Sequence, residues 1–170
     1  GAAVSRVPRR EHATGWERPD APRPWAEGVE PSEALPAGLL SAPVPEVARA
    51  LLGLRLVSTV AGRRVEAVIV EAEAYGGAED PASHAAVKAG RTARNAPMFG
   101  PAGRAYVYRI YGMHWCLNVV TGDEGRPQAV LLRGAEVLEG GAVAAERREG
   151  RTPLAAGPGR LCQALGVDGR

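Results

Sequence analysis

The chain has 170 residues, of which 45% are hydrophobic and 24% charged, a composition typical of one globular domain with its own core. It contains no run of eighteen apolar residues, so we expect no transmembrane helix. The first twenty residues are rich in Arg and Pro but lack an apolar segment, which argues against a secretory signal peptide. Cys116 and Cys162 are too few and too far apart for a disulfide framework or a zinc site. We therefore expect reduced thiols in an intracellular protein that is not secreted.

The formal net charge is only +2, but the charge is unevenly distributed. Between residues 81 and 122 the sequence has no Asp or Glu. The cations in this range are Lys88, Arg91, Arg94, Arg104 and Arg109. Charge alone leaves two interpretations open, a solvated basic face or a surface that binds a polyanion.

The predicted elements begin after a long N-terminal segment. Eight of the 14 prolines lie before residue 46, so we expect residues 1–40 to be a flexible arm and residues 41–170 to be the domain. "PEVARALLGL" predicts a short helix with Pro45 in its first turn. "LRLVSTVAGRRVEAVIVEAEAY" predicts a hairpin around Ala61-Gly62-Arg63.

The second half of the chain has no internal repeat of the first but contains further helix, loop and hairpin signals. "DPASHAAVKAG" predicts a helix from Asp80 to Gly90, and the Gly- and Pro-rich "RTARNAPMFGPAG" predicts a basic loop. "RAYVYRIYGMHWCLNVVTG" predicts a second hairpin with Tyr111 at its tip, where a side chain is normally polar. A strand and two helices follow in "QAVLLRGAEVLEG", "GGAVAAERREG" and "PGRLCQALG". Together these patterns predict an α+β domain.

The strand segment "VIVEAEAYGG" carries carboxylates where a buried strand would have Val or Ile. Alternation places Glu71, Glu73 and Tyr75 on one face, with Val70 among the residues on the other. Spacing alone leaves two uses for Glu73, His84 and Arg133. They can form a structural ion-pair cluster, which the spacing favours, or they can hold a water molecule with Glu73 as its base.

The aromatic residues offer a related pair of alternatives. Tyr75, His84 and Tyr108 near one carboxylate would suit a pocket for a planar ring, although Tyr in strands is also ordinary core packing. An exposed Tyr111 beside a basic loop would suit a wedge that separates stacked bases.

Four stretches resemble the motifs of the 3-methyladenine DNA glycosylase family, the alkyladenine type. They are "IVEAEAYGGAEDPASHA", "GRTARNAPMFGPAGRAYVYRIYGMHWCLNVV", "AVLLRGAEVLEG" and "GPGRLCQALG", in that order between residues 45 and 167. The resemblance implies a single domain with a mixed, mainly antiparallel curved sheet, short flanking helices and a protruding hairpin that carries Tyr111. Members of the family extend beyond the last motif, so we expect a domain that is incomplete at its C-terminus.

The resemblance also implies roles for single residues. Glu73 matches the general base and Arg133 the residue that helps hold the water. Tyr75, His84 and Tyr108 match the aromatics that enclose the extruded base, and His84 is expected among the catalytic residues as well. Asn118 matches the residue that opposes the 2-amino group of guanine, and Tyr111 the side chain that fills the gap in the duplex. Lys88, Arg91, Arg94, Arg104 and Arg109 are then expected on the DNA backbone.

These roles imply a monofunctional enzyme of base-excision repair that acts on double-stranded DNA. It would flip alkylated or deaminated purines (3-methyladenine, 7-methylguanine, hypoxanthine, etheno-adenine) out of the helix and hydrolyse the glycosidic bond. Neither a cofactor nor a metal is implied. We expect a monomer that contacts no membrane and lies in the cytoplasm, at the nucleoid, or elsewhere inside the cell.

Two other functions remain open at this stage. One is a truncated chain that binds damaged DNA without cleaving it. The other, which sets the resemblance aside, is a metal-dependent hydrolase with Glu71, Glu73 and His84 as ligands.

Overall fold

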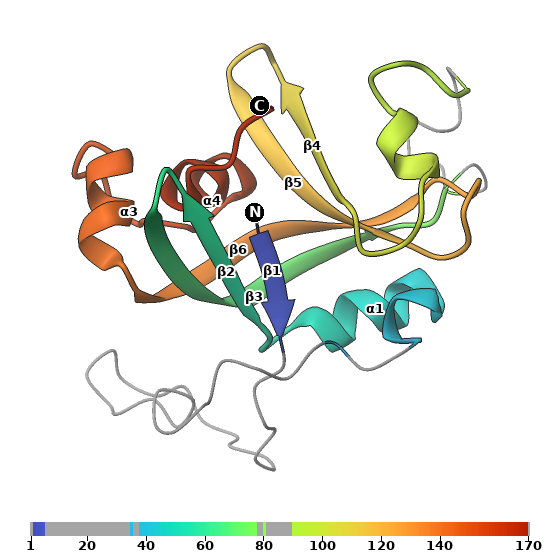
Figure 1. The fold of residues 1–170 in the computed structure, drawn as a ribbon, viewed down its shortest axis with the longest axis horizontal. Helices are drawn as coiled ribbons and strands as arrows, with labels where there is room; N and C mark the ends of the chain where they lie inside the picture. Colours follow the sequence, from blue (N-terminus) through green and yellow to red (C-terminus); the bar gives the residue numbers. More distant parts are fainter. Residues whose placement is uncertain (1, 6–34, 36–37, 78–79, 81–89, 170) are drawn as a thin grey trace.

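A computed structural model describes residues 2–5, 35, 38–77, 80 and 90–169. The helix expected between Asp80 and Gly90 falls almost entirely outside these residues, and so do His84 and Lys88. The described chain forms one antiparallel sheet with helices packed against it, which confirms the predicted α+β class (Figure 1).

The sheet has six strands in the order β1-β2-β3-β6-β5-β4, and every pair in it is antiparallel. The strands are β1 (Ala2–Ser5), β2 (Arg55–Val60), β3 (Arg63–Tyr75), β4 (Ala105–Ile110), β5 (His114–Thr121) and β6 (Gln128–Glu139). The long strands β3 and β6 pair at the centre. They form the support from which the β4–β5 hairpin projects (Figure 1).

Both predicted hairpins are confirmed at the predicted turns. Ala61 and Gly62 connect β2 to β3 with φ values of 53° and 72°, and Tyr111 and Gly112 start the β4–β5 turn at 52° and 67°. Positive φ at two successive turn residues matches the right-handed twist of the strands that they join. The two glycines adopt it without strain.

Part of the predicted arm belongs to the sheet. Ala2–Ser5 form the edge strand β1, which pairs with Arg55–Ser58 of β2. A 3-10 helix, η1 (Leu39–Ser41), then leads into the domain, and a second one, η2 (Ala96–Phe99), interrupts the predicted basic loop.

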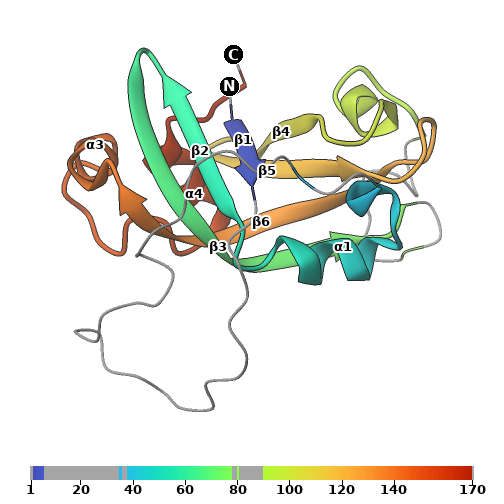
Figure 2. The ribbon, with the colours of Figure 1, turned by 60° about the horizontal axis from the view of Figure 1, so that its bottom comes forward.

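Three α-helices are described, α1 (Val44–Leu51), α3 (Gly141–Arg147) and α4 (Pro158–Leu165). Each was predicted from the sequence, and α1 turns Val44, Val47, Ala48 and Leu51 toward the core. Figure 2 shows α1 beside β3 and β6, and α3 near the far end of β6. The core joins α1 and α4 to the sheet, with fully buried Leu51, Leu56, Leu132 and Leu161. In the described part of the chain, no helix combines the length and apolarity that crossing a bilayer requires.

The central pair β3–β6 contains an irregularity that decides which side chains face the core. Ile69 pairs with Ala135 and Ala72 with Leu132, but between them only Glu71 and Gly134 pair, so Val70 and Arg133 are each left over. Ile69, Ala135, Ala72 and Leu132 all belong to the core cluster. Both strands therefore change phase here, as β-bulges allow. Val70 is 56% exposed and does not lie on the core face with Ala72, so that part of the alternation prediction was wrong.

Two glycines that flank α3, Gly140 and Gly150, allow a test of how closely the start of this helix packs against β3. Gly140 and Gly150 both have φ +72°, but a Cβ at Gly140 would lie 2.3 Å from the carbonyl oxygen of Arg64, whereas one at Gly150 would meet nothing within 4 Å. We expect Gly150→Ala to cost about 1–2 kcal/mol from left-handed backbone strain alone. Gly140→Ala should cost about 1–3 kcal/mol more because of the clash. Urea unfolding of both variants measures the difference, and equal costs would mean that the clash is relieved without penalty.

Candidate active site

Two residues singled out from the sequence, Glu73 and Asn118, lie in one row across the face of the sheet opposite the main core. In the strand register Tyr106 pairs with Asn118, Asn118 with Leu131, and Leu131 with Glu73. Paired residues in antiparallel strands point to the same face, so these four side chains share one side. The phase change at Val70 and Arg133 is what keeps Glu73 off the core face, since Val65, Ala67 and Ile69 of the same strand face the core.

Glu73 is held by two hydrogen bonds. Tyr75 Oη donates to Glu73 Oε1 at 2.7 Å, and Arg133 Nη1 donates to Glu73 Oε2 at 2.8 Å. Arg133 Nε also donates to Glu71 Oε1 at 3.1 Å, so one guanidinium bridges both carboxylates. The Glu73 side chain remains 41% exposed. Because a carboxylate has about four acceptor positions, Glu73 keeps capacity for a water molecule.

The ion pair between Glu73 and Arg133, which the spacing favoured, is therefore present. The role of Glu73 as the base for a water molecule stays a prediction. The ion pair orients the carboxylate but does not bury it. The contribution of His84 to this cluster lies outside the described residues.

Tyr75 is fixed as a hydrogen-bond donor. Burial, strengthened by the Glu73 carboxylate, raises the pKa of Tyr75 to about 12. At neutral pH the phenol is therefore protonated, and it positions Glu73 rather than competing with it for a proton. Burial also raises the pKa of Tyr108 and that of Cys116 beside it.

A wide cleft opens where strand β5 leaves β6. The pairs between these strands run only from Thr121–Gln128 to Asn118–Leu131. Farther along β6 the chain preceding α4 takes the place of β5, with a bridge between Gly134 and Ala156. The cleft between β5 and the chain preceding α4 has a volume of about 1060 Å³. On the strand side it is lined by Tyr75, Tyr108, Cys116, Leu131 and Arg133. A planar group could lie in this cleft against the two tyrosines, next to the Glu73–Arg133 pair.

The neighbouring aromatics are arranged as a layer. The rings of Tyr106 and Tyr108 stack with centroids 5.3 Å apart. Asn118 is buried and donates from Nδ2 to the carbonyl oxygen of Tyr106 at 3.1 Å. At the hairpin tip Tyr111 is 85% exposed and still lines the end of the cleft.

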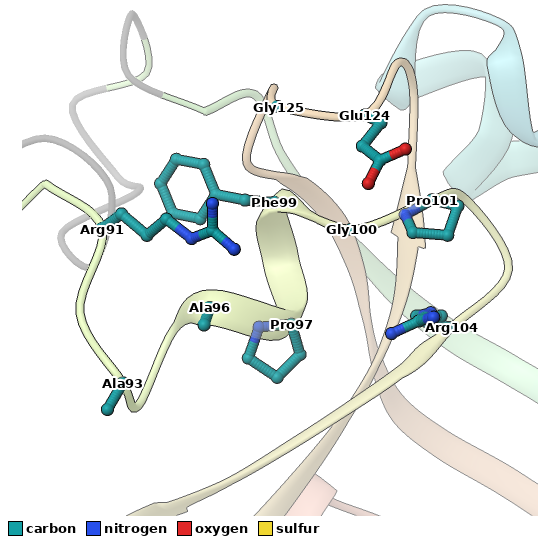
Figure 3. A pocket seen from close by; sticks show the side chains of 10 residues that line it. All are labelled: Arg91, Ala93, Ala96, Pro97, Phe99, Gly100, Pro101, Arg104, Glu124 and Gly125. Atoms are coloured by element: carbon teal, nitrogen blue, oxygen red, sulfur yellow. The ribbon is translucent and has the colours of Figure 1, made fainter.

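The predicted backbone-contacting arginines occupy two places. Arg94 lies 5.7 Å from the centre of the Tyr108 ring and donates to the carbonyl oxygen of Arg109, whose own guanidinium stacks on Trp115. Arg91 and Arg104 line a second pocket of about 510 Å³ (Figure 3). There Arg91 lies over the ring of Phe99, and Glu124 borders the same pocket. Lys88 lies outside the described residues.

The described residues give no support to the metal-hydrolase alternative. Within them no group of three or more His, Cys, Asp or Glu side chains gathers as a metal site would require. Glu71 and Glu73 are bridged by a cation instead.

Comparison with known protein families identifies the family of this chain. The model of the methylpurine-DNA glycosylase (MPG) family matches residues 39–170. The chain belongs to the methylpurine-DNA glycosylase family. The resemblance seen in the sequence motifs is thereby confirmed, and the match includes Glu73, Tyr75, Tyr108 and Arg133.

Relatives that are about 50% identical over the aligned residues occur in several bacteria. A protein of Streptomyces avermitilis, named "Putative 3-methyladenine DNA glycosylase", is 51% identical over 129 residues, which cover 74% of this chain and 60% of the relative. Proteins of the same name from Frankia casuarinae and Anaeromyxobacter dehalogenans are 55% and 52% identical, over 75% and 78% of this chain and 58% of each relative. The chain thus spans about 60% of the length of these relatives.

Sequence reasoning missed one group of residues that line the cleft of this MPG-family chain. Arg148, Arg151 and Arg160 line the cleft opposite Tyr75 and Tyr108. Their only local signal is the Arg content of "ERREGR" and "PGR", which does not reveal that the chain folds back beside β6.

The raised pKa of Tyr75 predicts a pH effect on stability. A tyrosine whose pKa rises from 10 unfolded to about 12 folded stabilises the protein fully below pH 10, and that contribution disappears as the pH rises through 12. We expect the urea midpoint to fall between pH 10 and 12, and to fall less steeply in Tyr75→Phe. Parallel pH profiles for the two proteins would contradict the assignment to Tyr75.

Proposed function

We propose that this chain is a monofunctional DNA glycosylase that removes alkylated or deaminated purines from double-stranded DNA. Family membership and the held carboxylate of Glu73 support the proposal. The observation that carries it is the placement of Glu73 beside a cleft lined by Tyr75 and Tyr108, which pairs a candidate base with a site for a planar ring.

In the proposed reaction the target nucleotide leaves the duplex and its base enters the cleft between aromatic side chains. Enzymes that act on a base inside a duplex must extrude it, and unstacking costs least for damaged or mispaired bases. Stacking on aromatic rings then recovers about 1–3 kcal/mol per base. Tyr75, Tyr108 and, by family correspondence, His84 are the proposed stacking partners.

Glu73 then takes a proton from a water molecule that attacks the anomeric carbon as the glycosidic bond breaks. Arg133 and Tyr75 orient the carboxylate from either side, at 2.8 and 2.7 Å. A cationic alkylated purine is a good leaving group by itself, so a single carboxylate is enough, unlike the acid–base pairs of sugar glycosidases. The products are the free base and an abasic site, with the strand intact.

A single-turnover assay tests the proposal. The chain in excess is incubated with duplexes that carry one 7-methylguanine, one hypoxanthine, or no lesion, and base release is separated from strand scission by treating half of each sample with alkali. Release of a damaged purine, with nicks only after alkali, is the expected result. Selective binding without release would favour a damaged-DNA-binding protein. Equal binding of all three duplexes would show that the chain does not recognise lesions.

The hairpin tip gives a separate prediction. From its exposure we propose that Tyr111 occupies the gap in the duplex, and Tyr111→Ala should weaken affinity for the lesion duplex by about 1–3 kcal/mol while changing affinity for undamaged DNA less. Leu52→Ala, which trims an exposed apolar side chain at the end of α1, is the matched control. Fluorescence anisotropy on both duplexes measures the effect, and an equal loss on both would argue against the wedge.

A further inference from the structure

The wall of the cleft opposite the strands is strongly cationic. The segment that joins α3 to α4 contributes Arg148 and Arg151 to this wall, and the first turn of α4 contributes Arg160. Arg133 adds a further cation to the same cleft, and none of the described residues that line it is Asp or Glu. Arg133 is paired with Glu71 and Glu73, and Arg151 with Glu149, so the uncompensated charge belongs to Arg148 and Arg160.

Arg148 is the unusual member of this wall. It is only 6% exposed, yet no described carboxylate lies within ion-pair distance of it. Its Nη1 donates to Gln163 Oε1, and its buried Nε has no hydrogen-bond partner. Burial and the nearby charges of Arg160 and Arg151 lower its pKa. A buried guanidinium without an anion is costly, so this arrangement is stabilised when an anion enters the cleft.

The start of α4 faces the same space. Gly157 caps the helix without a side-chain hydrogen bond, and Gly157, Pro158, Gly159 and Arg160 all line the cleft. The first amides of a helix have no partner within it, and the helix dipole favours negative charge at this end. A Cβ at Gly159 would lie 3.1 Å from His114, so glycine lets the helix start close to β5.

We propose that Arg148, Arg160 and the first turn of α4 bind one phosphate group of the DNA backbone at the extruded nucleotide. The choice of a backbone phosphate rests on the function proposed above. A nucleotide whose base stacks on Tyr75 and Tyr108 has its phosphate on the other side of the sugar, and the cleft places the cationic wall there. The site would hold the sugar between the phosphate and Glu73, which aligns the anomeric carbon for attack.

The first experiment needs neither DNA nor activity. Inorganic phosphate is titrated into the protein, and binding is followed by ¹H–¹⁵N shifts of the amides of Gly159 and Arg160. Arg160→Gln, an exposed substitution that leaves the core intact, should weaken binding about tenfold or more. Arg148→Gln should do the same if it folds. Arg49→Gln on α1 removes the same charge away from the cleft and should change binding little. Unchanged binding in Arg160→Gln would overturn the site.

The second experiment identifies the source of the phosphate. Each phosphate around the lesion is replaced in turn by an uncharged methylphosphonate, and affinity is measured for the wild type and for Arg160→Gln. One position should weaken wild-type binding and have no effect on the variant. If inorganic phosphate binds in the cleft but no position behaves this way, the backbone assignment is overturned and the site takes free phosphate. If the chain fails to release any base, the phosphate titration still decides the site, so the two proposals fail separately.

Discussion

Glu73→Gln is expected to lower the single-turnover rate of base release by about 10²–10⁴-fold and to leave affinity for lesion DNA nearly unchanged. Glutamine keeps an oxygen that can accept from Tyr75 or Arg133, so the shape of the site survives. The substitution removes the group that would accept the proton from water. Rates are measured with excess protein on a 7-methylguanine duplex, and affinity by anisotropy on the same duplex.

The matched control for this prediction is Glu71→Gln. Glu71 lies on the same strand and shares the Arg133 guanidinium, but its side chain is 57% exposed. Among the described residues it is not bonded to Tyr75 and does not line the cleft. We expect it to lose less than about tenfold in rate, as a residue that only helps orient Arg133. Equal losses in the two variants would assign the effect to the ion-pair cluster as a whole. An active Glu73→Gln would exclude Glu73 as the base.

The largest expected effect on stability comes from Glu66, which has no part in the site. Glu66 is 1% exposed on β3, and its Oε1 lies 2.5 Å from Nη1 of Arg55, which is 8% exposed on β2. Removing one partner of a buried ion pair leaves the other charge uncompensated, at a cost of about 3–5 kcal/mol. We therefore expect Glu66→Ala to lower the free energy of unfolding by that amount, measured by urea denaturation at pH 7.

Arg64 provides the control for Glu66. It contacts the other oxygen of Glu66 at 2.5 Å, but its side chain is 45% exposed. An exposed pair contributes at most about 1 kcal/mol, so Arg64→Ala should have a small effect. Replacing both Arg55 and Glu66 by Met and Leu should restore much of the stability, because the desolvation cost then disappears. If Glu66→Ala costs no more than Arg64→Ala, the pair is not buried in solution.

Local signals in the sequence were enough to predict the hairpins and helices. The turn at Gly62, the turn at Gly112 and the prolines that start α1 and α4 act within a few residues of themselves. The buried charge of Glu66 was not predicted, because its partner lies on another strand and a carboxylate in a strand normally signals an exposed face.

The site was predicted only in part, for the same reason. Spacing singled out Glu73, Tyr75, Tyr108 and Arg133, and family motifs suggested their roles; their side chains come together at one cleft and one ion pair. The cationic wall depends on the bridge between Gly134 and Ala156, which joins residues far apart in the sequence. Strict alternation also failed at Val70, because a bulge depends on how the partner strand pairs.

Val70 and Arg133 are one extra residue on each of two paired strands, and because they lie opposite each other their effects on the register cancel. Their paired presence returns the two strands to their original register after Ala72, so the defect does not spread along the sheet. Deleting Val70 alone would leave Arg133 without an opposing extra residue, so the residues from Ala72 to Tyr75 would pair one position out of step with β6, or β6 would keep a bulge of its own. This part of the chain should therefore accept many substitutions but almost no change in length, and sequence variants that lose one residue here should also lose one opposite it.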